Sequence, residues 1–90
     1  MPRARTVSQD AVRFGAIVRR LRMHRGWTIV DFARFTKMSA HYLGVLERGG
    51  NVPTLDTILQ LTETLGVEAA EVFRELELAR KRPVAANVHP

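Results

Sequence analysis

The chain has 90 residues, of which 46% are hydrophobic, and this length indicates one small domain with a single modest core. It contains no cysteine, which excludes a disulfide framework and a thiolate metal site. The net charge of +5 fits either a well-solvated surface or a polyanionic partner. A partner is favoured by the first 25 residues, where seven arginines accompany only one acid, Asp10.

The first predicted helix covers residues 9–25. Ser8 can cap it, because a serine oxygen accepts a hydrogen bond from an amide of the first turn. Gly26 ends it. Its apolar residues recur at the i, i+3, i+4, i+7 spacing that gathers side chains on one helix face. They are Phe14, Ile17, Val18 and Leu21.

Two short helices follow, over residues 29–36 and 40–48. Thr28 and Asp31 have the T-x-x-D spacing of a capping box, and Ser39 can cap the second helix. Because only a few residues separate the two helices, they cannot pack antiparallel, and we expect them to cross steeply as in a helix-turn-helix. An ordinary corner of a helical bundle is the alternative.

The last two helices are predicted over residues 55–65 and 68–80, with Thr54 as the first cap and Gly66 as the first stop. The inward face expected for the first comprises Leu55, Ile58, Thr62 and Leu65. The inward stripe expected for the second comprises Ala69, Val72, Phe73, Leu76 and Ala79.

These elements predict an all-α fold, a compact five-helix bundle that contains a helix-turn-helix. The domain should extend over residues 8–80. A flexible basic arm, residues 1–7, precedes it, and a disordered tail, residues 81–90, follows it.

Several motifs between residues 12 and 75 carry a family resemblance. Gly26 precedes the capped second helix, Ala33 is the small residue where two helices touch, and "LERG" closes the third helix. "PT" at residues 53–54 opens the fourth helix and "LGV" ends it. In these features the chain resembles the phage-repressor and Cro-like family of helix-turn-helix proteins, often called XRE-like. The resemblance implies a lambda-repressor-like domain that binds double-stranded DNA as a homodimer on a palindromic operator and regulates transcription as a repressor or autoregulator.

The resemblance also implies a structural ion pair between Arg22, late in the first helix, and Glu47 of the "LERG" segment. A partly buried pair of this kind fixes orientation more than it adds stability. Two separately solvated charges are the alternative.

Several positions depart from the family pattern. Ile29 replaces a glutamine that contacts phosphate, and Thr36 replaces a buried leucine. Lys37 occupies the turn position usually held by glycine, so its backbone must become left-handed, at a cost of about 1 kcal/mol, or the turn must differ. Val30 and Phe35 are expected outward on the second helix, although they are apolar.

The expected base-reading face of the third helix offers few readers. It consists of Ala40, His41, Gly44 and Val45. Only His41 can hydrogen-bond to a base edge, while Ala40 and Val45 can at most contact thymine methyl groups. Recognition should therefore depend mainly on DNA form and on the spacing of the dimer.

Phosphate contacts are expected around this face, since the amides at helix starts favour anions. The residues expected to contact phosphate are Thr28, Lys37, Ser39, Tyr42, Arg48, Asn51 and Thr54. Arg3 and Arg5 can form an arm that enters the minor groove, unless that segment is only solubilising.

Two residues of the last helix, Ala70 and Leu78, lie off its inward stripe and suggest a dimer interface. Pairing through the last two helices would place two recognition helices one DNA turn apart. A different hypothesis is a helix-turn-helix module that binds a protein partner, which Ile29, Val30 and Phe35 would support.

Other chemistries find little support in the sequence. The three histidines are too scattered for a metal site, and no nucleophile elbow or phosphate-binding glycine loop is present. We expect no enzyme activity, metal, cofactor or small-molecule ligand domain. No apolar run approaches the roughly 18 residues of a membrane span, and the start "MPRARTVSQD" lacks the apolar centre of a secretory signal. We therefore expect a cytoplasmic protein associated with the nucleoid.

Overall fold

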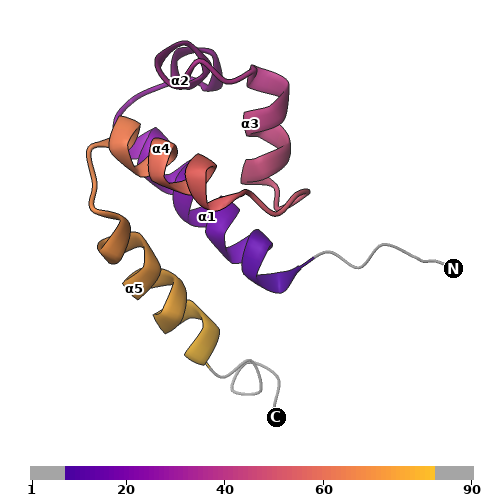
Figure 1. The fold of residues 1–90 in the computed structure, drawn as a ribbon, viewed down its shortest axis with the longest axis vertical. Coiled ribbons are helices and arrows are strands. Elements are labelled where there is room, and N and C mark those ends of the chain that lie inside the picture. The colour runs from indigo at the N-terminus through magenta and orange to yellow at the C-terminus, as the bar shows by residue number, and fades with distance from the viewer. Residues whose placement is uncertain (1–7, 83–90) are drawn as a thin grey trace, which may run out of the picture.

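Five α-helices make up the part of the chain that this computed structural model describes, residues 8–82 (Figure 1). They are α1 (Gln9–His24), α2 (Ile29–Thr36), α3 (Ala40–Glu47), α4 (Leu55–Leu65) and α5 (Ala69–Lys81). The prediction of an all-α fold is confirmed, and every helix end lies within one residue of its expected position. Arg3 and Arg5 lie outside the described residues.

Short polar side chains begin four of the five helices. The hydroxyl oxygens of Ser8, Ser39 and Thr54 each accept a hydrogen bond from the backbone amide three residues later, at 3.1, 2.9 and 3.1 Å. At α2 the bonding is reciprocal, because Thr28 and Asp31 each accept from the other's amide at 3.0 Å. The bond that the Thr28 amide donates to the carboxylate, with a smaller contribution from the Thr28 side chain, holds the pKa of Asp31 below its ordinary value.

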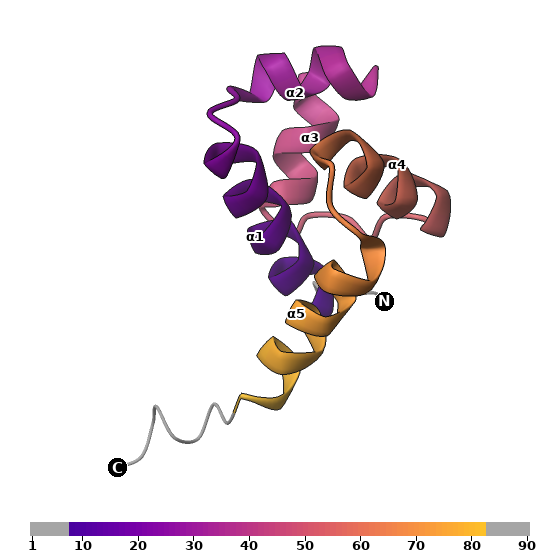
Figure 2. The ribbon, with the colours of Figure 1, turned by 90° about the vertical axis from the view of Figure 1, so that its left-hand side faces the viewer.

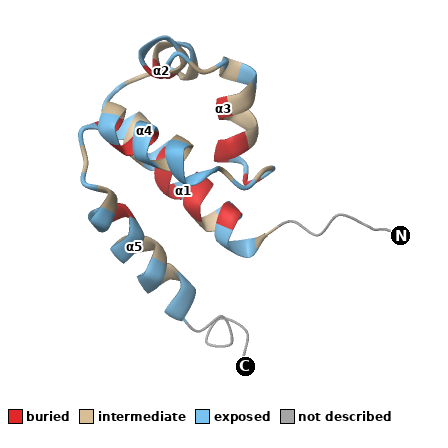
Figure 3. Cartoon of the chain, in the orientation of Figure 1, coloured by how far each residue is buried: buried red, intermediate tan, exposed pale blue. Residues whose placement is uncertain are grey.

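The hydrophobic core lies where α1 packs against α3 on one side and α5 on another, with α4 closing the remaining side (Figures 1 and 2). Figure 3 shows the buried residues on the inner sides of the helices. The buried cluster consists of Phe14, Ile17, Val18, Phe32, Leu43, Leu46, Leu61, Leu65 and Val72. None of the helices in residues 8–82 is long and apolar enough to span a bilayer.

A glycine allows the closest approach between α1 and α3. A Cβ atom on Gly15 would lie 2.3 Å from the carbonyl oxygen of Leu46 and 2.7 Å from that of Glu47. Both contacts are with backbone, so no side-chain rotation would relieve them. Gly15 therefore sets how near the last turn of α3 lies to α1.

The inward face of α4 differs from the expected one. Leu55, expected inside, is 64% exposed, whereas Leu61 is fully buried. The inward residues Ile58, Leu61, Thr62 and Leu65 follow the i, i+3, i+4, i+7 spacing, so the stripe begins one turn later than expected.

Phe73 of α5, expected in the core, is 40% exposed. It borders a small apolar hollow whose lining includes Phe14, Ile58 and Leu76. The ring therefore lies at the margin of the core, with one side against the bundle and the other in solvent.

Candidate nucleic-acid interface

The turn between α2 and α3 is fixed by a left-handed residue and a buried threonine. Lys37 has φ 64° and ψ 22° and is the only non-glycine residue with positive φ among residues 8–82. The Thr36 hydroxyl donates to the carbonyl of Phe32 at 2.9 Å and accepts from the amide of Met38 at 3.1 Å. Gln60 of α4 donates to the carbonyl oxygen of Thr36 at 2.6 Å. Of the two options that the sequence leaves at Lys37, the chain takes the left-handed one.

This turn makes α2 and α3 cross steeply, so that they form no continuous rod (Figure 2). The hydroxyl of Thr36 both donates and accepts a hydrogen bond. This explains how a polar side chain can be buried at a position where the family pattern has leucine. A capped helix, a tight turn and a second capped helix crossing the first together define a helix-turn-helix.

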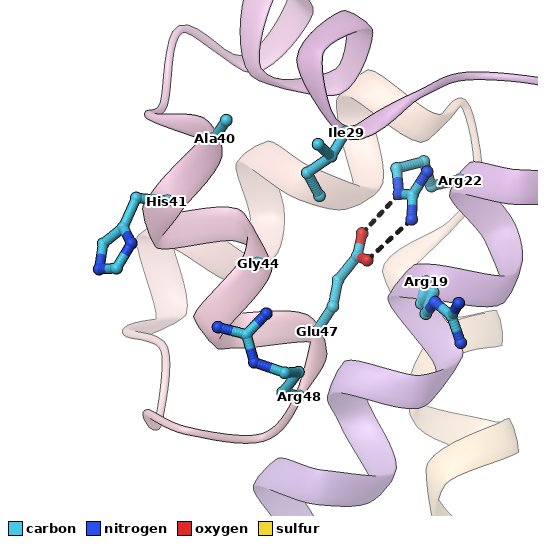
Figure 4. Close-up of a pocket in the computed structure, with 8 residues that line it drawn as sticks. All are labelled: Arg19, Arg22, Ile29, Ala40, His41, Gly44, Glu47 and Arg48. Carbon is cyan, nitrogen blue, oxygen red and sulfur yellow. Dashed lines mark hydrogen bonds and ion pairs between the residues drawn. The ribbon is translucent and has the colours of Figure 1, made fainter.

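The structure brings Arg22 and Glu47 together in a bidentate ion pair (Figure 4). Arg22 Nε donates to Glu47 Oε2 at 2.7 Å and Arg22 Nη2 donates to Glu47 Oε1 at 3.0 Å. Arg22 Nη1 also donates to the carbonyl oxygen of Trp27 at 2.7 Å. The two side chains are only 11% and 5% exposed. One guanidinium group therefore ties α1 to α3 and to the segment that leads into α2.

The four residues of the expected base-reading face are not packed in the core. His41 is exposed, while Ala40, Gly44 and Val45 are half-buried. In Figure 4 the His41 ring points away from α1. Three of the four residues, Ala40, His41 and Gly44, border a hollow of about 600 Å³ that α1 lines from the other side. The hollow is lined by Arg19, Arg22, Ile29, Ala40, His41, Gly44, Glu47 and Arg48.

The hollow carries positive charge. Glu47 is its only acidic lining residue, and both of its carboxylate oxygens accept from Arg22. No ion pair within residues 8–82 engages Arg19 or Arg48. No contact at this site is expected for Arg19 from the sequence, although it lies one helical turn before Arg22. Two arginines are therefore available to an anion that approaches α3.

The residues expected to contact phosphate differ in exposure. Lys37, Ser39 and Thr54 are exposed, and so are Thr28 and Arg48. Thr28, however, donates its amide to the carboxylate of Asp31, and a negative charge at the start of α2 disfavours a second anion there.

The other two expected phosphate contacts are half-buried. Tyr42 packs against the core, and the Oδ1 atom of Asn51 is buried without a hydrogen-bond partner among the described residues. Both are therefore less accessible to a phosphate than the exposed residues.

The apolar outward residues of α2 have different surroundings. Phe35 is 47% exposed and packs on Trp27 with the ring centroids 4.8 Å apart, while Val30 is 57% exposed. The guanidinium of Arg25 lies over the Trp27 ring at 5.3 Å and donates to the carbonyl oxygen of Leu65 at the end of α4. Phe35 thus extends an aromatic cluster that joins α2 to the end of α1.

On the opposite side of the bundle, the two residues expected at a dimer interface are exposed. Ala70 lies near the start of α5, and Leu78, near its end, is 59% exposed.

Comparison with known proteins identifies the class to which this geometry belongs. A family model described as "Helix-turn-helix domain" matches residues 13–76. The HTH-type transcriptional regulator DdrOP3 of Deinococcus deserti is 35% identical over 60 residues, which are 67% of this chain and 46% of that protein. The chain thus spans about half the length of that relative.

Two solved structures are similar over most of the described fold. The clp gene regulator ClgR of C. glutamicum gives a TM-score of 0.77 at 25% identity, over 84% of this chain and 99% of that one. The restriction-modification controller protein C.AhdI of Aeromonas hydrophila gives 0.70 at 33% identity, over 73% of this chain and 100% of that one. The chain belongs to the XRE-like helix-turn-helix family, a family of DNA-binding transcriptional regulators.

Proposed function

We propose that the chain regulates transcription by binding double-stranded DNA sequence-specifically, as a homodimer on a palindromic operator, with α3 in the major groove. The observation that carries the proposal is the open side of α3. It is held in place by the Arg22–Glu47 pair and borders a hollow in which Arg19 and Arg48 have no acidic partner.

In this proposal the outward residues of α3 face the bases and the surrounding residues hold the backbone. Ala40, His41, Gly44 and Val45 lie against the base edges, where His41 can hydrogen-bond and the others act by shape. Exposed Lys37, Ser39 and Thr54 are the best-placed phosphate contacts, and Arg19 joins them from α1.

Exposed apolar residues on α4 and α5 support the homodimer. Leu55, Leu59 and Leu78 are 64%, 45% and 59% exposed. The single chain therefore leaves several large apolar side chains of these two helices in contact with solvent. A second copy packed on α4 and α5, Ala70 included, would bury them and set the spacing of two recognition helices.

The relatives support the proposed regulatory role. Those named above are a transcriptional regulator, a gene regulator and a restriction-modification controller, and we propose that this chain is a repressor or autoregulator acting on DNA in the cytoplasm.

The test is selection of bound sequences from a random DNA pool, with the solution mass measured alongside. We expect a two-fold symmetric enriched sequence, a mass twice that of the monomer, and affinity that falls with salt with a log–log slope of several units. Leu78→Glu should halve the mass. An unenriched pool or salt-independent binding would contradict the proposal.

A second candidate function is binding of a protein partner through α2, which the exposure of Val30 and Phe35 favours. Under that hypothesis Val30→Ser should abolish the interaction while Arg19→Ala leaves it intact. The first proposal predicts instead that Arg19→Ala weakens binding to DNA and that Val30→Ser leaves it unchanged.

A further inference from the structure

Arg48 is the C-cap residue of α3, but its guanidinium covers the helix one turn earlier. A Cβ atom on Gly44 would lie 3.3 Å from Arg48 Nη1 and 4.0 Å from Nη2. Helical side chains lean toward the N-terminus, so residue 48 covers the surface over residue 44. Because Gly44 has no side chain, the guanidinium can lie against the outer side of α3 (Figure 4).

We propose that Arg48 reads a guanine from this position and so supplies the base-reading donor that the helix otherwise lacks. This inference rests on the proposed function. Arginine donates in a bidentate fork to O6 and N7 of guanine in the major groove, the commonest specific contact between proteins and DNA. His41, Gly44 and Arg48 stand at the i, i+3, i+7 spacing that shares one helix face, so the guanidinium over Gly44 lies on the face that carries His41.

The guanidinium of Arg48 is available for this contact. The acid beside it, Glu47, is fully engaged by Arg22, and Arg48 makes no side-chain hydrogen bond or ion pair within residues 8–82. Arg48 is exposed, so its side chain can reach a base edge without breaking a hydrogen bond or ion pair of the folded protein.

The sequence suggests that Arg48 contacts a phosphate. Its position over Gly44 instead favours a contact with a base. Arg19 lies on α1, across the same hollow from α3 (Figure 4). Arg48 lies instead on the side of α3 that carries His41. The two arginines therefore differ in a testable way, since Arg48 should act on one base pair and Arg19 on all sequences alike.

The test compares sequences selected from a random DNA pool by the wild type, Arg48→Ala and Arg19→Ala. Each variant loses one guanidinium and one positive charge, so the two are matched. We expect a guanine at one position of each wild-type half-site, and Arg48→Ala should lose roughly 10- to 100-fold of the discrimination there. Arg19→Ala should keep the same guanine and lower affinity by one common factor on matched and mismatched sites.

Gly44→Ala is a second variant, and we expect it to fold at least as well as the wild type. Its Cβ displaces the guanidinium by a few tenths of an ångström, and alanine favours the helix over glycine. We expect a weakened preference at the same guanine in a protein that melts at a higher temperature.

Retention of the guanine preference by Arg48→Ala, or an equal loss on every sequence, would overturn the inference while leaving the proposed function intact. A wild-type site without a fixed guanine would do the same. A wild-type protein that binds no DNA would overturn the proposed function together with this inference.

Discussion

The inner and outer sides of α3 each involve one glycine, but in opposite ways. On the inner side, Gly15 of α1 lies so close to the backbone of Leu46 and Glu47 that no Cβ atom fits. On the outer side, a Cβ on Gly44 would meet only the flexible end of Arg48. The inner side is therefore fixed by backbone packing, whereas the outer side can change its chemistry without changing the fold.

Removing the carboxylate of the inner side should have the largest effect. Glu47→Ala leaves the Arg22 guanidinium, whose side chain is 11% exposed, as a buried charge without its partner, and breaking such a pair costs about 3–5 kcal/mol. Urea unfolding measures the loss. Glu47→Gln retains the shape and one hydrogen-bond acceptor, so its loss should be smaller. An unchanged unfolding midpoint for Glu47→Ala would show that the ion pair does not stabilise the fold.

Replacing either glycine with alanine tests whether the two sides of α3 differ in this way. Gly15→Ala should lower the free energy of unfolding by about 1–3 kcal/mol, because α1 and α3 must separate to admit the Cβ. Gly44→Ala should raise it by roughly 0.5–1 kcal/mol through helix propensity. Thermal unfolding of both variants gives the two signs, and a change of the same sign in both would contradict the difference between the two sides.

An exposed residue on the outer side should affect recognition and leave stability unchanged. His41→Ala should change the preference at one base pair by roughly 1–3 kcal/mol, because a single hydrogen bond to a base edge is lost. Competition binding with single-base variants of the selected site measures it. Equal weakening on every variant would mean that His41 contacts the backbone.

The smallest effect is expected at the start of α2. The pKa of Asp31 is lowered by the hydrogen bonds from Thr28, so its carboxylate adds stability above the ordinary aspartate pKa, and this contribution is lost as the pH falls through the folded-state value. Asp31→Asn should therefore melt below the wild type near neutral pH, and the difference should shrink as the pH falls below the ordinary aspartate pKa. A difference that is independent of pH would contradict this linkage.

Much of the fold could be predicted because local signals agree with one another. Ser8, Thr28, Ser39 and Thr54 mark four helix starts by side-chain chemistry alone, and each makes the expected cap. Lys37 could be recognised as the turn residue because the family resemblance assigns this position to a turn glycine.

What the sequence could not predict depends on contacts between distant segments. Leu55 and Leu61 are equally apolar, and only the place of α4 against α1, α2 and α5 decides which one is buried. The approach of Gly15 to α3 likewise requires the position of a second helix.

The candidate site shows the same division. Its base-facing positions follow from helix periodicity, but the fold-back of Arg48 over Gly44 and the place of Arg19 beside α3 depend on side-chain direction and tertiary packing. For this reason, sequence reasoning gave Arg48 a phosphate contact and gave Arg19 no role.

An NMR titration of the protein with its selected DNA site, followed through backbone amide shifts, tests whether α3 is the surface that binds DNA. We expect the largest shifts at Ala40, His41, Gly44 and Val45, with little change at Val30 and Phe35. Shifts concentrated on the outer side of α2, or the absence of shifts on α3, would contradict this expectation.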